Sequence, residues 1–392
     1  MSEPVQENAS PALLADYTTL GLGGPARHFV SAGTEADLTE AVHAADQAGE
    51  PVLLIGGGSN LVVSDAGFPG TAIHVNTRGI SFARGDEHRG DEHRADQYGA
   101  DESGAAETVD VTVAAGHDWD DVVAATVAEG LAGLEPLSGI PGRAGATPIQ
   151  NVGAYGREVA EVITQVRVYD RQEDNIQVIP NEACSFSYRT SLFKSGRPAA
   201  LVAAPSPAAG QPRYVVLDVT FRLARQSLSA PVGYAELAAE LGVAMGEQAA
   251  AAEVRAAVIK IRGRKGMVLN PGDPDTRSAG SFFTNPVITA AQFARVEAQA
   301  AARGIAQVPH YPAADGLVKV PAAWLIEHSG FAKGYGAPGP ARVSAKHTLA
   351  LVNADNATAT DLLALAREIV SGVHAAYGVP LTPEPILIGL TL

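Results

Sequence analysis

Two glycine-rich stretches constrain the fold of this chain more than any other feature. The first, LLIGGGSN at 53–60, places consecutive glycines directly after an apolar run typical of a buried strand. The second, LSGIPGRAGATPIQNVGAYGREV at 137–159, combines glycines and prolines with almost no charge. Consecutive glycines allow backbone angles that other residues avoid, so both stretches predict loops that hold bare main chain against a flat or phosphorylated ligand. For the first stretch taken alone, a tight turn is an equally good interpretation.

Neither stretch is a familiar phosphate motif. No Gly-Lys-Ser/Thr follows the first, which excludes a Walker loop, and its glycines do not have the Gly-x-Gly-x-x-Gly spacing of a Rossmann turn. What remains is a nest of backbone N–H groups after a strand, in which Ser59 and Asn60 can donate hydrogen bonds to phosphate oxygens.

Composition sets the class of protein. The 392 residues are 46% hydrophobic and 18% charged, which indicates a globular chain of two or three domains. A net charge of −15 and a pI near 5.1 argue against nucleic-acid or anionic-membrane partners, so an anionic ligand requires local lysines and arginines. The start MSEPVQENASPALL has no basic or long apolar segment, and we expect a cytoplasmic protein. The single cysteine, Cys184, excludes an internal disulfide and multi-cysteine zinc, and is expected in the core.

Periodicity predicts an α+β chain. A helix over EADLTEAVHAADQAGE and the strands PVLLI and GTAIHV form a small first unit. The middle is rich in strands, with a hairpin at VITQVRVYDRQEDNIQVI. A loop dense in glycine and proline, VLNPGDPDTRSAG, precedes a third unit with helices over VITAAQFARVEAQAAARG and TATDLLALAREIVSGVHAAYG, the second capped by Thr358 and Asp361. The final LTPEPILIGLTL reads as a strand that pairs with an earlier one.

A tandem repeat of RGDEH interrupts the pattern after Arg84. Its Asp86, His88, Asp91 and His93 have the side chains of a metal site, but a charged repeat without apolar anchors is typical of a solvated loop. We predict that this insertion is dispensable and that the protein holds no metal.

Three further segments carry polar side chains in apolar surroundings. In FSYRTSLFK, Arg189 next to Tyr188 is either a solvated side chain or a bidentate clamp for a carboxylate. In SAGSFFTNP, Ser281 is either a turn hydroxyl or a proton donor in a dry pocket; no His-Asp pattern marks it as an activated nucleophile. In TPEPILIG, Glu384 is either a capping group or an acid-base residue.

The order of these segments resembles one family. TTLGLGGPARHFV, LLIGGGSNLVVSD, GLEPLSGIPGRAGATPIQNVGAYGREV, SYRTSLFK, AGSFFTNPV, ADGLVKVPAAWLIE and TPEPILIG occur with the order and approximate spacing of the MurB family, flavoprotein UDP-N-acetylenolpyruvoylglucosamine reductases. The resemblance covers the chain except for its first dozen residues and the RGDEH insertion.

The resemblance implies a vanillyl-alcohol-oxidase-type (PCMH-type) FAD-binding fold of two α/β subdomains and a C-terminal α/β substrate-binding domain. The implied bounds are 1–78 with the terminal strand 384–392, 79–264 with an insertion at 84–108, and 265–383. It also implies non-covalent FAD, NADPH as hydride donor, and loops whose main chain binds the cofactor. The implied cofactor-binding residues are Ile55, Gly56, Gly57, Gly58, Ser59, Asn60, Pro141, Gly142, Gly145, Ala146, Gln150, Asn151, Gly153, Ala154, Tyr155 and Gly156.

The family reaction reduces UDP-N-acetylglucosamine enolpyruvate to UDP-N-acetylmuramate during peptidoglycan synthesis, and the resemblance gives roles to matching residues. Arg189 and Glu384 would bind and polarise the substrate carboxylate, the latter in its protonated form, and Ser281 would protonate carbon. The implied substrate-binding residues are Tyr188, Tyr234, Lys265, Asn285, Tyr311 and Lys319, with Arg262 as a further cation. Tyr234 matches the longer, first type of the family.

Two positions depart from the family pattern. Ile386 stands where many members carry a basic residue, so the orientation of the substrate carboxylate is expected to rest more heavily on Arg189. His328 stands where members often have glutamine. The rival hypotheses are another FAD oxidoreductase of this fold, such as a sugar or alcohol oxidase, and a non-catalytic flavin or nucleotide-sugar binding protein. The segments around Ser281 and Glu384 favour the reductase, which we expect to act as a monomer.

Overall fold

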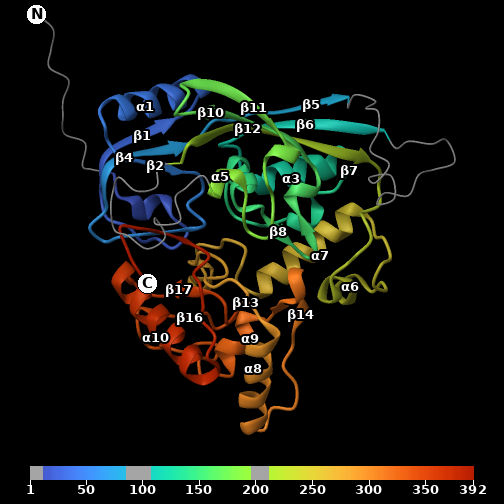
Figure 1. The fold of residues 1–392 in the computed structure, drawn as a ribbon. Coiled ribbons are helices and arrows are strands. Elements are labelled where there is room, and N and C mark those ends of the chain that lie inside the picture. Colours follow the sequence, from blue (N-terminus) through green and yellow to red (C-terminus); the bar gives the residue numbers. More distant parts are fainter. Residues whose placement is uncertain (1–11, 85–106, 196–211) are drawn as a thin grey trace, which may run out of the picture.

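The computed structural model describes residues 12–84, 107–195 and 212–392. A broad antiparallel sheet lies above a small parallel sheet and a helical third part (Figure 1). The RGDEH repeat, with its candidate ligands Asp86, His88, Asp91 and His93, lies outside the described residues. No group of candidate metal-ligating side chains occurs within those residues. Among the helices of the same residues, none combines the length and apolar character needed to cross a bilayer.

The first part is a three-stranded parallel sheet of order β1-β4-β2, made of β1 (Ala26–Ala32), β2 (Val52–Ile55) and β4 (Phe68–Val75). Helix α1 (Glu35–Gln47) begins at a capping box closed by Thr34 and packs Leu38, Val42 and Ala45 into the core, as the periodicity predicts. The first glycine stretch leaves the carboxyl end of β2. That edge of a parallel sheet is where ligands usually bind.

The carboxyl-terminal strand returns to this part. Strand β18 (Ile386–Ile388) pairs in parallel with β3 (Leu61–Val63), and the Ile386 amide donates to the Asn60 carbonyl at 2.9 Å. The expectation that the last segment pairs with an earlier strand is confirmed. The pairing brings Glu384 next to the end of the first glycine stretch.

The second part is a six-stranded sheet of order β11-β10-β12-β6-β5, with β7 also on β12. Its apolar face packs on α3 (Trp119–Ala128), and its other face is polar and reaches α1 through an Arg167–Glu35 ion pair. The predicted hairpin is confirmed as β10 and β11. The strands are β5 (Ile80–Arg84), β6 (Thr108–Ala114), β7 (Leu131–Ala132), β10 (Ile163–Asp170), β11 (Asn175–Pro180) and β12 (Tyr214–Arg225).

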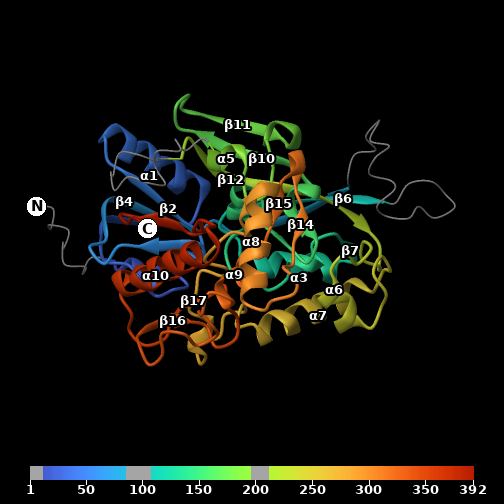
Figure 2. The same cartoon turned by 60° about the horizontal axis from the view of Figure 1, so that its bottom comes forward.

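Short elements of the second glycine stretch and three more helices lie below this sheet in Figure 1, and Figure 2 shows the molecule with its bottom turned forward. Cys184 is fully buried here, as expected, and burial raises the pKa of its thiol to about 12. The elements are α4 (Thr147–Gln150), β8 (Gly153–Ala154), β9 (Arg157–Glu158), α5 (Leu192–Ser195), α6 (Ala235–Leu241) and α7 (Ala251–Arg264).

The third part combines helices with two small sheets. Both predicted helices are present, and α10 has the predicted capping box of Thr358 and Asp361. The elements are β13 (Val287–Ile288), α8 (Ala290–Ala302), β14 (Tyr311–Pro312), β15 (Val318–Lys319), α9 (Ala322–Glu327), β16 (Ala341–Val343), β17 (Leu351–Asn353) and α10 (Ala359–Tyr377).

The third part shares a core with the amino-terminal part. Leu20, Leu22 and Val62 belong to the same buried cluster as Phe282 and the apolar face of α10. The Asp65 carboxylate adds to this contact, because it accepts hydrogen bonds from the amides of Ala359 and Thr360 at 2.8 and 3.1 Å. The two parts are therefore packed as one body.

Candidate active site

The two glycine stretches touch through their main chains. A Cβ on Gly57 would lie 2.7 Å from the Gly142 Cα, and one on Gly58 would lie 1.9 Å from the Tyr17 carbonyl oxygen, closer than real Cβ atoms come. The Ser59 hydroxyl donates to the Pro141 carbonyl at 2.8 Å and links the loops. The two segments hold bare main chain against each other and against Tyr17. That they also hold it against a flat or phosphorylated ligand stays a prediction.

The side chains that close the first stretch have protein partners. The Asn60 side-chain amide donates to the Glu384 carbonyl at 3.5 Å. The Ser59 hydroxyl already donates to the Pro141 carbonyl. The hydrogen bonds that these two side chains could give to a phosphate remain a prediction. The backbone N–H groups of the loop are the better candidates for anion binding.

The second stretch is anchored by Asn151, which is 1% exposed and left-handed at φ 44°. Its side-chain Nδ2 donates to the Glu158 carboxylate at 2.7 Å and to the Ser187 carbonyl at 3.1 Å, so Asn151 orders the loop. Gly145 packs so closely on Ala115 that a Cβ would lie 2.5 Å away. The remaining predicted cofactor residues of this stretch lie within five residues of these anchors in the sequence, and their contact with a cofactor stays a prediction: Pro141, Gly142, Ala146, Gln150, Gly153, Ala154, Tyr155 and Gly156.

Two buried donors of the second stretch have no partner within the described residues. These are Gln150 Nε2 and Arg143 Nε. A buried N–H group without an acceptor is costly, so both atoms fit a ligand rich in acceptor oxygens or ring nitrogens. With the close-packed glycines beside them, the residues present fit FAD.

Arg189 and Glu384 form the charged centre of the site. Tyr188 and Arg189 occupy a tight turn closed by two hydrogen bonds of 3.0 Å between Ser187 and Thr190, and Arg189 is left-handed at φ 55°. A non-glycine residue in that region is strained, as is common at functional sites. Its Nε lies 3.1 Å from Glu384 Oε1, and its other nitrogens donate to the carbonyls of Asn151 and Gly153 at 3.2 and 2.7 Å.

Ser281 reaches the same centre through the main chain. The Glu384 amide donates to the Phe282 carbonyl at 2.9 Å, and Phe283 pairs with Pro383, so the segment of Ser281 lies beside that of Glu384. Within the described residues, no hydrogen bond engages the Ser281 hydroxyl. The structure thus brings together three segments centred at 189, 281 and 384.

Burial raises the pKa of the Glu384 carboxyl, although the charges of Arg189 and Lys194 act in the opposite direction. Lys194 was not anticipated from sequence. Its ammonium donates to Gln150 Oε1 at 2.7 Å and to the Arg189 carbonyl at 2.9 Å, which fixes both neighbours. A carboxyl group in this environment retains its proton to a higher pH than an exposed glutamate.

A second group of predicted residues surrounds the Tyr188 ring. Lys319 Nζ lies 5.0 Å from the ring centroid, and the Arg189 guanidinium lies 5.3 Å from it on the neighbouring residue. Tyr311 pairs with Lys319 between β14 and β15 and is 57% exposed. Asn285 faces inward, because its Oδ1 accepts the first amide of α9, that of Ala322, at 2.9 Å. That contact gives Asn285 a structural role beside its predicted one.

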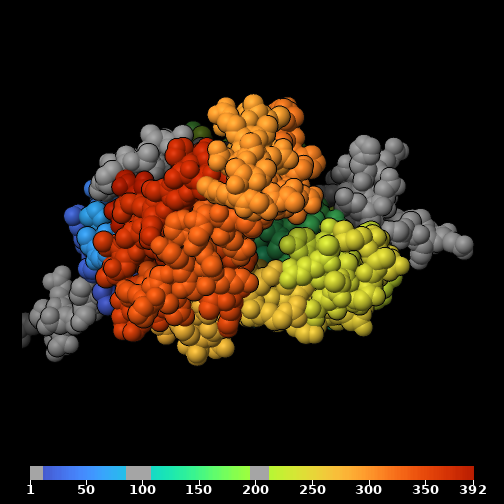
Figure 3. All heavy atoms as spheres, turned by 90° about the horizontal axis from the view of Figure 1, so that it is seen from below, coloured from blue at the N-terminus to red at the C-terminus, as the bar shows by residue number. Residues whose placement is uncertain are grey.

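A third group lies under α6 and α7. The rings of Tyr234 and Tyr155 meet edge to face at 5.4 Å, and Lys265 at the end of α7 pairs with Glu236 at 2.5 Å. Arg262 donates to the Gly139 carbonyl at 3.2 Å, so it ties α7 to the second glycine stretch. In the view of Figure 3, the green middle part of the chain is visible in a hollow between the orange third part and yellow α6.

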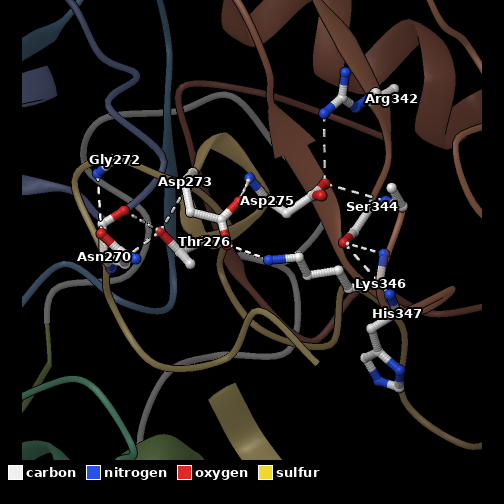
Figure 4. Close-up of polar contacts among 10 residues, drawn as sticks. Asn270, Gly272, Asp273, Asp275, Thr276, Arg342, Ser344, Lys346 and His347 are labelled. Atoms are coloured by element: carbon white, nitrogen blue, oxygen red, sulfur yellow. Dashed lines mark hydrogen bonds and ion pairs between the residues drawn. The ribbon is translucent and has the colours of Figure 1, made fainter. Parts of the chain in front are cut away.

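A polar network orders the loop that leads to Ser281 (Figure 4). The carboxylate of Asp273 pairs with Lys346, and Asp275 Oδ1 accepts the Ala345 amide at 3.1 Å and lies 3.6 Å from Arg342 Nη2. The hydroxyl of Ser344 accepts the Lys346 amide at 3.1 Å. The Gly-Pro loop is thus held against β16 and the turn that follows it. From sequence, the glycines and prolines of this loop predicted only a boundary between two units.

The side chains at the two departing positions pack on apolar and aromatic neighbours. Ile386 packs against the small cluster that contains Leu61 and Val63. His328 stacks on Trp324 with ring centroids 4.3 Å apart, and its Nδ1 lies 2.8 Å from the Trp324 carbonyl. The cations that act on the Glu384 carboxyl are Arg189 and Lys194. That the orientation of the substrate carboxylate rests on Arg189 stays a prediction.

Comparison with known proteins identifies the family. Residues 273–388 match the family model of the UDP-N-acetylenolpyruvoylglucosamine reductase C-terminal domain, and residues 26–178 match that of an FAD binding domain. The UDP-N-acetylenolpyruvoylglucosamine reductase of Thermobifida fusca is 50% identical over 97% of each chain. That of Streptomyces coelicolor is 49% identical over 100% of this chain and 92% of its own.

The fold agrees with a solved structure of the same name. The crystal structure of MurB from Thermus caldophilus superposes with a TM-score of 0.57 at 24% identity and covers 97% of this chain and 98% of its own. This match supports a PCMH-type FAD-binding fold with an additional C-terminal domain. With half of its residues identical to those of a reductase over nearly the full length of both, the chain belongs to the MurB family of UDP-N-acetylenolpyruvoylglucosamine reductases.

Proposed function

We propose that the protein is an FAD-dependent oxidoreductase that reduces UDP-N-acetylglucosamine enolpyruvate to UDP-N-acetylmuramate with NADPH, in peptidoglycan synthesis. The observation that carries the proposal is the contact of Arg189 with Glu384 beside the segment of Ser281. Family membership supports the substrate, and the two uncompensated donors in the second glycine stretch support the cofactor.

The cofactor would lie against the main chain of 56–60 and 141–156, with Gln150 Nε2 as a side-chain donor. Bound FAD supplies the hydride that it takes from NADPH. The chain itself holds and orients the acceptor. Addition of hydride to the vinyl carbon of the enolpyruvyl group places negative charge on the adjacent carbon and its carboxylate, and preorganised charge lowers the barrier to that step.

We assign that stabilisation to Arg189 and Glu384. The Arg189 guanidinium is held by two backbone carbonyls, which fix its position before a substrate carboxylate binds. Glu384 in its protonated form donates a hydrogen bond to the same group, and its raised pKa favours this form. Ser281 donates the proton to carbon. Because a hydroxyl is a weak acid, solvent or a further donor must return that proton.

We assign Lys265 and Lys319 to the diphosphate of UDP. Each already contacts a side chain of the site, Glu236 and Tyr188 respectively. Tyr234, Tyr311 and Asn285 complete the proposed substrate set. All catalytic groups come from one chain, so we also propose a monomer that acts in the cytoplasm, which light scattering and fractionation would test.

The replacement Ser281→Ala tests the assignment of the proton donor. We expect NADPH to bleach the flavin at the normal rate, while reoxidation by the enolpyruvyl nucleotide sugar slows by about 10²- to 10⁴-fold, the usual contribution of a general acid. Anaerobic stopped-flow absorbance of the flavin separates the two half-reactions. Thr284→Ala is the matched control, because its hydroxyl lies three residues away and donates to the Thr382 carbonyl at 3.4 Å.

Unchanged reoxidation in Ser281→Ala would refute that role and leave the flavin assignment intact. A colourless wild-type protein that does not bind added FAD would refute the proposed function itself. Flavin reduction without any reoxidation by the nucleotide sugar would favour a different oxidoreductase of the same fold.

A further inference from the structure

Arg143 is the charged residue of a segment, 137–156, whose other side chains are uncharged. Its aliphatic stem lies on the first glycine loop: a Cβ placed on Gly56 would meet Arg143 Cγ at 3.2 Å and Cβ at 3.3 Å. The backbone of Arg143 also forms an isolated antiparallel β-bridge with that of Asp118. Arg143 therefore stands where the two glycine stretches meet, with its stem packed on one and its backbone belonging to the other.

The guanidinium is only partly compensated. Its side chain is 17% exposed, and Nη1 donates to Asp118 Oδ2 at 2.9 Å, but Nε is buried without a hydrogen-bond partner in the described residues. The Asp118 side chain is 44% exposed, so water weakens the pair. A buried guanidinium donor without an acceptor is rare and indicates a missing partner.

Arg143 has charged neighbours of both signs. Burial and the charge of Arg78 lower the pKa of the Arg143 guanidinium, although Asp118 and Asp121 oppose the shift. Burial, Arg143 and Arg78 also lower the pKa of the His74 imidazole. His74 pairs in register with Ile55, so these groups gather at the carboxyl ends of β2 and β4, where the first glycine loop begins. In a chain of net charge −15, Arg78 and Arg143 are two cations near the start of this loop that are available to an anion bound there.

We propose that Arg143 pairs with the diphosphate of FAD and supplies the countercharge that the uncharged glycine loops lack. The inference rests on the proposed function in that it takes FAD as the ligand. The substrate also contains a diphosphate, but the lysines assigned to it, Lys265 and Lys319, contact Glu236 and Tyr188, whereas Arg143 packs on Gly56. The location therefore favours the cofactor.

The test is FAD affinity measured on protein freed of its flavin. Arg143→Gln retains the stem and a donor but removes the charge, and Arg143→Lys retains the charge without the fork of donors. We expect Arg143→Gln to raise the Kd for FAD by about 10- to 100-fold, as loss of a charged hydrogen bond does, and Arg143→Lys to raise it less. Quenching of flavin fluorescence on binding gives Kd, and a series of NaCl concentrations gives its salt dependence.

The salt dependence separates a phosphate contact from a merely structural role. The wild-type Kd should rise with NaCl more steeply than that of Arg143→Gln, because one ion pair is lost in the variant. Arg222→Gln is the matched control, since Arg222 pairs with Asp110 at 2.7 Å on the polar face of the large sheet and is 25% exposed. That variant should retain both the wild-type Kd and its salt dependence.

Equal Kd and equal salt dependence in wild type and Arg143→Gln would overturn the inference while leaving the flavoprotein intact. An increase in KM for the nucleotide sugar with an unchanged FAD Kd would overturn it as well, in favour of the substrate diphosphate. Failure of wild-type protein to bind FAD would instead overturn the proposed function. If Arg143→Gln does not fold, as judged by its melting curve, Arg143→Lys and the wild-type salt series decide the question.

Discussion

The Glu384 carboxyl combines two opposing influences, and their balance can be measured. Burial raises its pKa, while the cations that face it, Arg189 from the turn and Lys194 from α5, lower it. A raised pKa means that the protonated, donating form persists to higher pH and is lost as the pH rises through that value. We therefore predict that flavin reoxidation by the nucleotide sugar slows on the alkaline side of this pKa.

The variant Lys194→Gln should shift the pH dependence of flavin reoxidation in a defined direction. Removal of one cation destabilises the carboxylate, so the alkaline limb of the reoxidation rate should move to higher pH. Stopped-flow reoxidation rates over a pH series would measure the shift, with Lys260→Gln on the exposed face of α7 as control. A limb that moves to lower pH, or does not move, would show that another group controls it.

Gly58 and Gly49 offer a matched pair for the close approach of main chains. Both are left-handed, at φ 59° and 66°, but a Cβ on Gly49 meets nothing within 4 Å, whereas one on Gly58 would lie 1.9 Å from the Tyr17 carbonyl oxygen. Gly49→Ala should cost about 1 to 2 kcal/mol of unfolding free energy, the cost of the left-handed conformation. Gly58→Ala should cost more and also release FAD, as urea melts and retained flavin absorbance would show.

Equal losses of stability in the two variants would contradict the contact with Tyr17. Sequence alone predicts that Gly58 belongs either to a loop of bare main chain or to a tight turn, because consecutive glycines allow backbone angles that other residues avoid. It does not predict that the partner of Gly58 is Tyr17, or that Lys194 acts on Glu384 from 190 positions earlier, since such contacts depend on how distant segments pack.

At the level of elements, local rules predicted the long helices α1, α8 and α10 and the hairpin of β10 and β11, but missed the contacts between elements. The capping box of α10 follows from the spacing of Thr358 and Asp361, and the structure has it. Asp65, which lies 294 residues from Ala359 in sequence, also caps this helix, and no local pattern reveals that. The side-chain hydroxyl of Thr360 donates to the same carboxylate at 3.0 Å.

This second cap predicts a local effect of Asp65→Ala. Loss of an N-terminal cap usually costs about 0.5 to 2 kcal/mol, and here it should also free two amides, those of Ala359 and Thr360. Native-state hydrogen exchange should speed up at both. The Asp361 amide is an internal control, because it donates to the Thr358 hydroxyl at 3.1 Å and keeps that partner. Unchanged exchange at 359 and 360 would contradict the role of Asp65.

On the scale of the whole molecule, the division of the sequence into units hides a shared core. The predicted boundaries separate 1–78 from 265–383, yet Leu20 and Leu22 lie in one buried cluster with Phe282 and Leu362. Hydrophobic periodicity shows that a residue is buried but not which element it meets, so this contact could not be read from the chain. The boundaries as bounds of folding units stay a prediction. The packing indicates that the first and third units unfold together.

The two tryptophans make that cooperativity measurable. Trp119 lies on α3 beneath the large sheet and Trp324 on α9 in the third part, so Trp119→Phe leaves a single reporter of the third part. In urea, the emission of Trp324 and the release of flavin should change at one midpoint. Leu22→Ala should lower the free energy of unfolding by about 2 to 5 kcal/mol, because Leu22 is buried at 3% exposure. Both urea midpoints should therefore fall together.

Leu228→Ala is the control for that experiment, since Leu228 is 46% exposed and its truncation removes little buried area. Both midpoints should stay at the wild-type value in this variant. If Trp324 instead reports unfolding at a urea concentration where flavin is still bound, the third part unfolds on its own. The cluster around Leu22 would then be a contact between separate domains, and the Ser281 segment could leave Glu384 without loss of the cofactor.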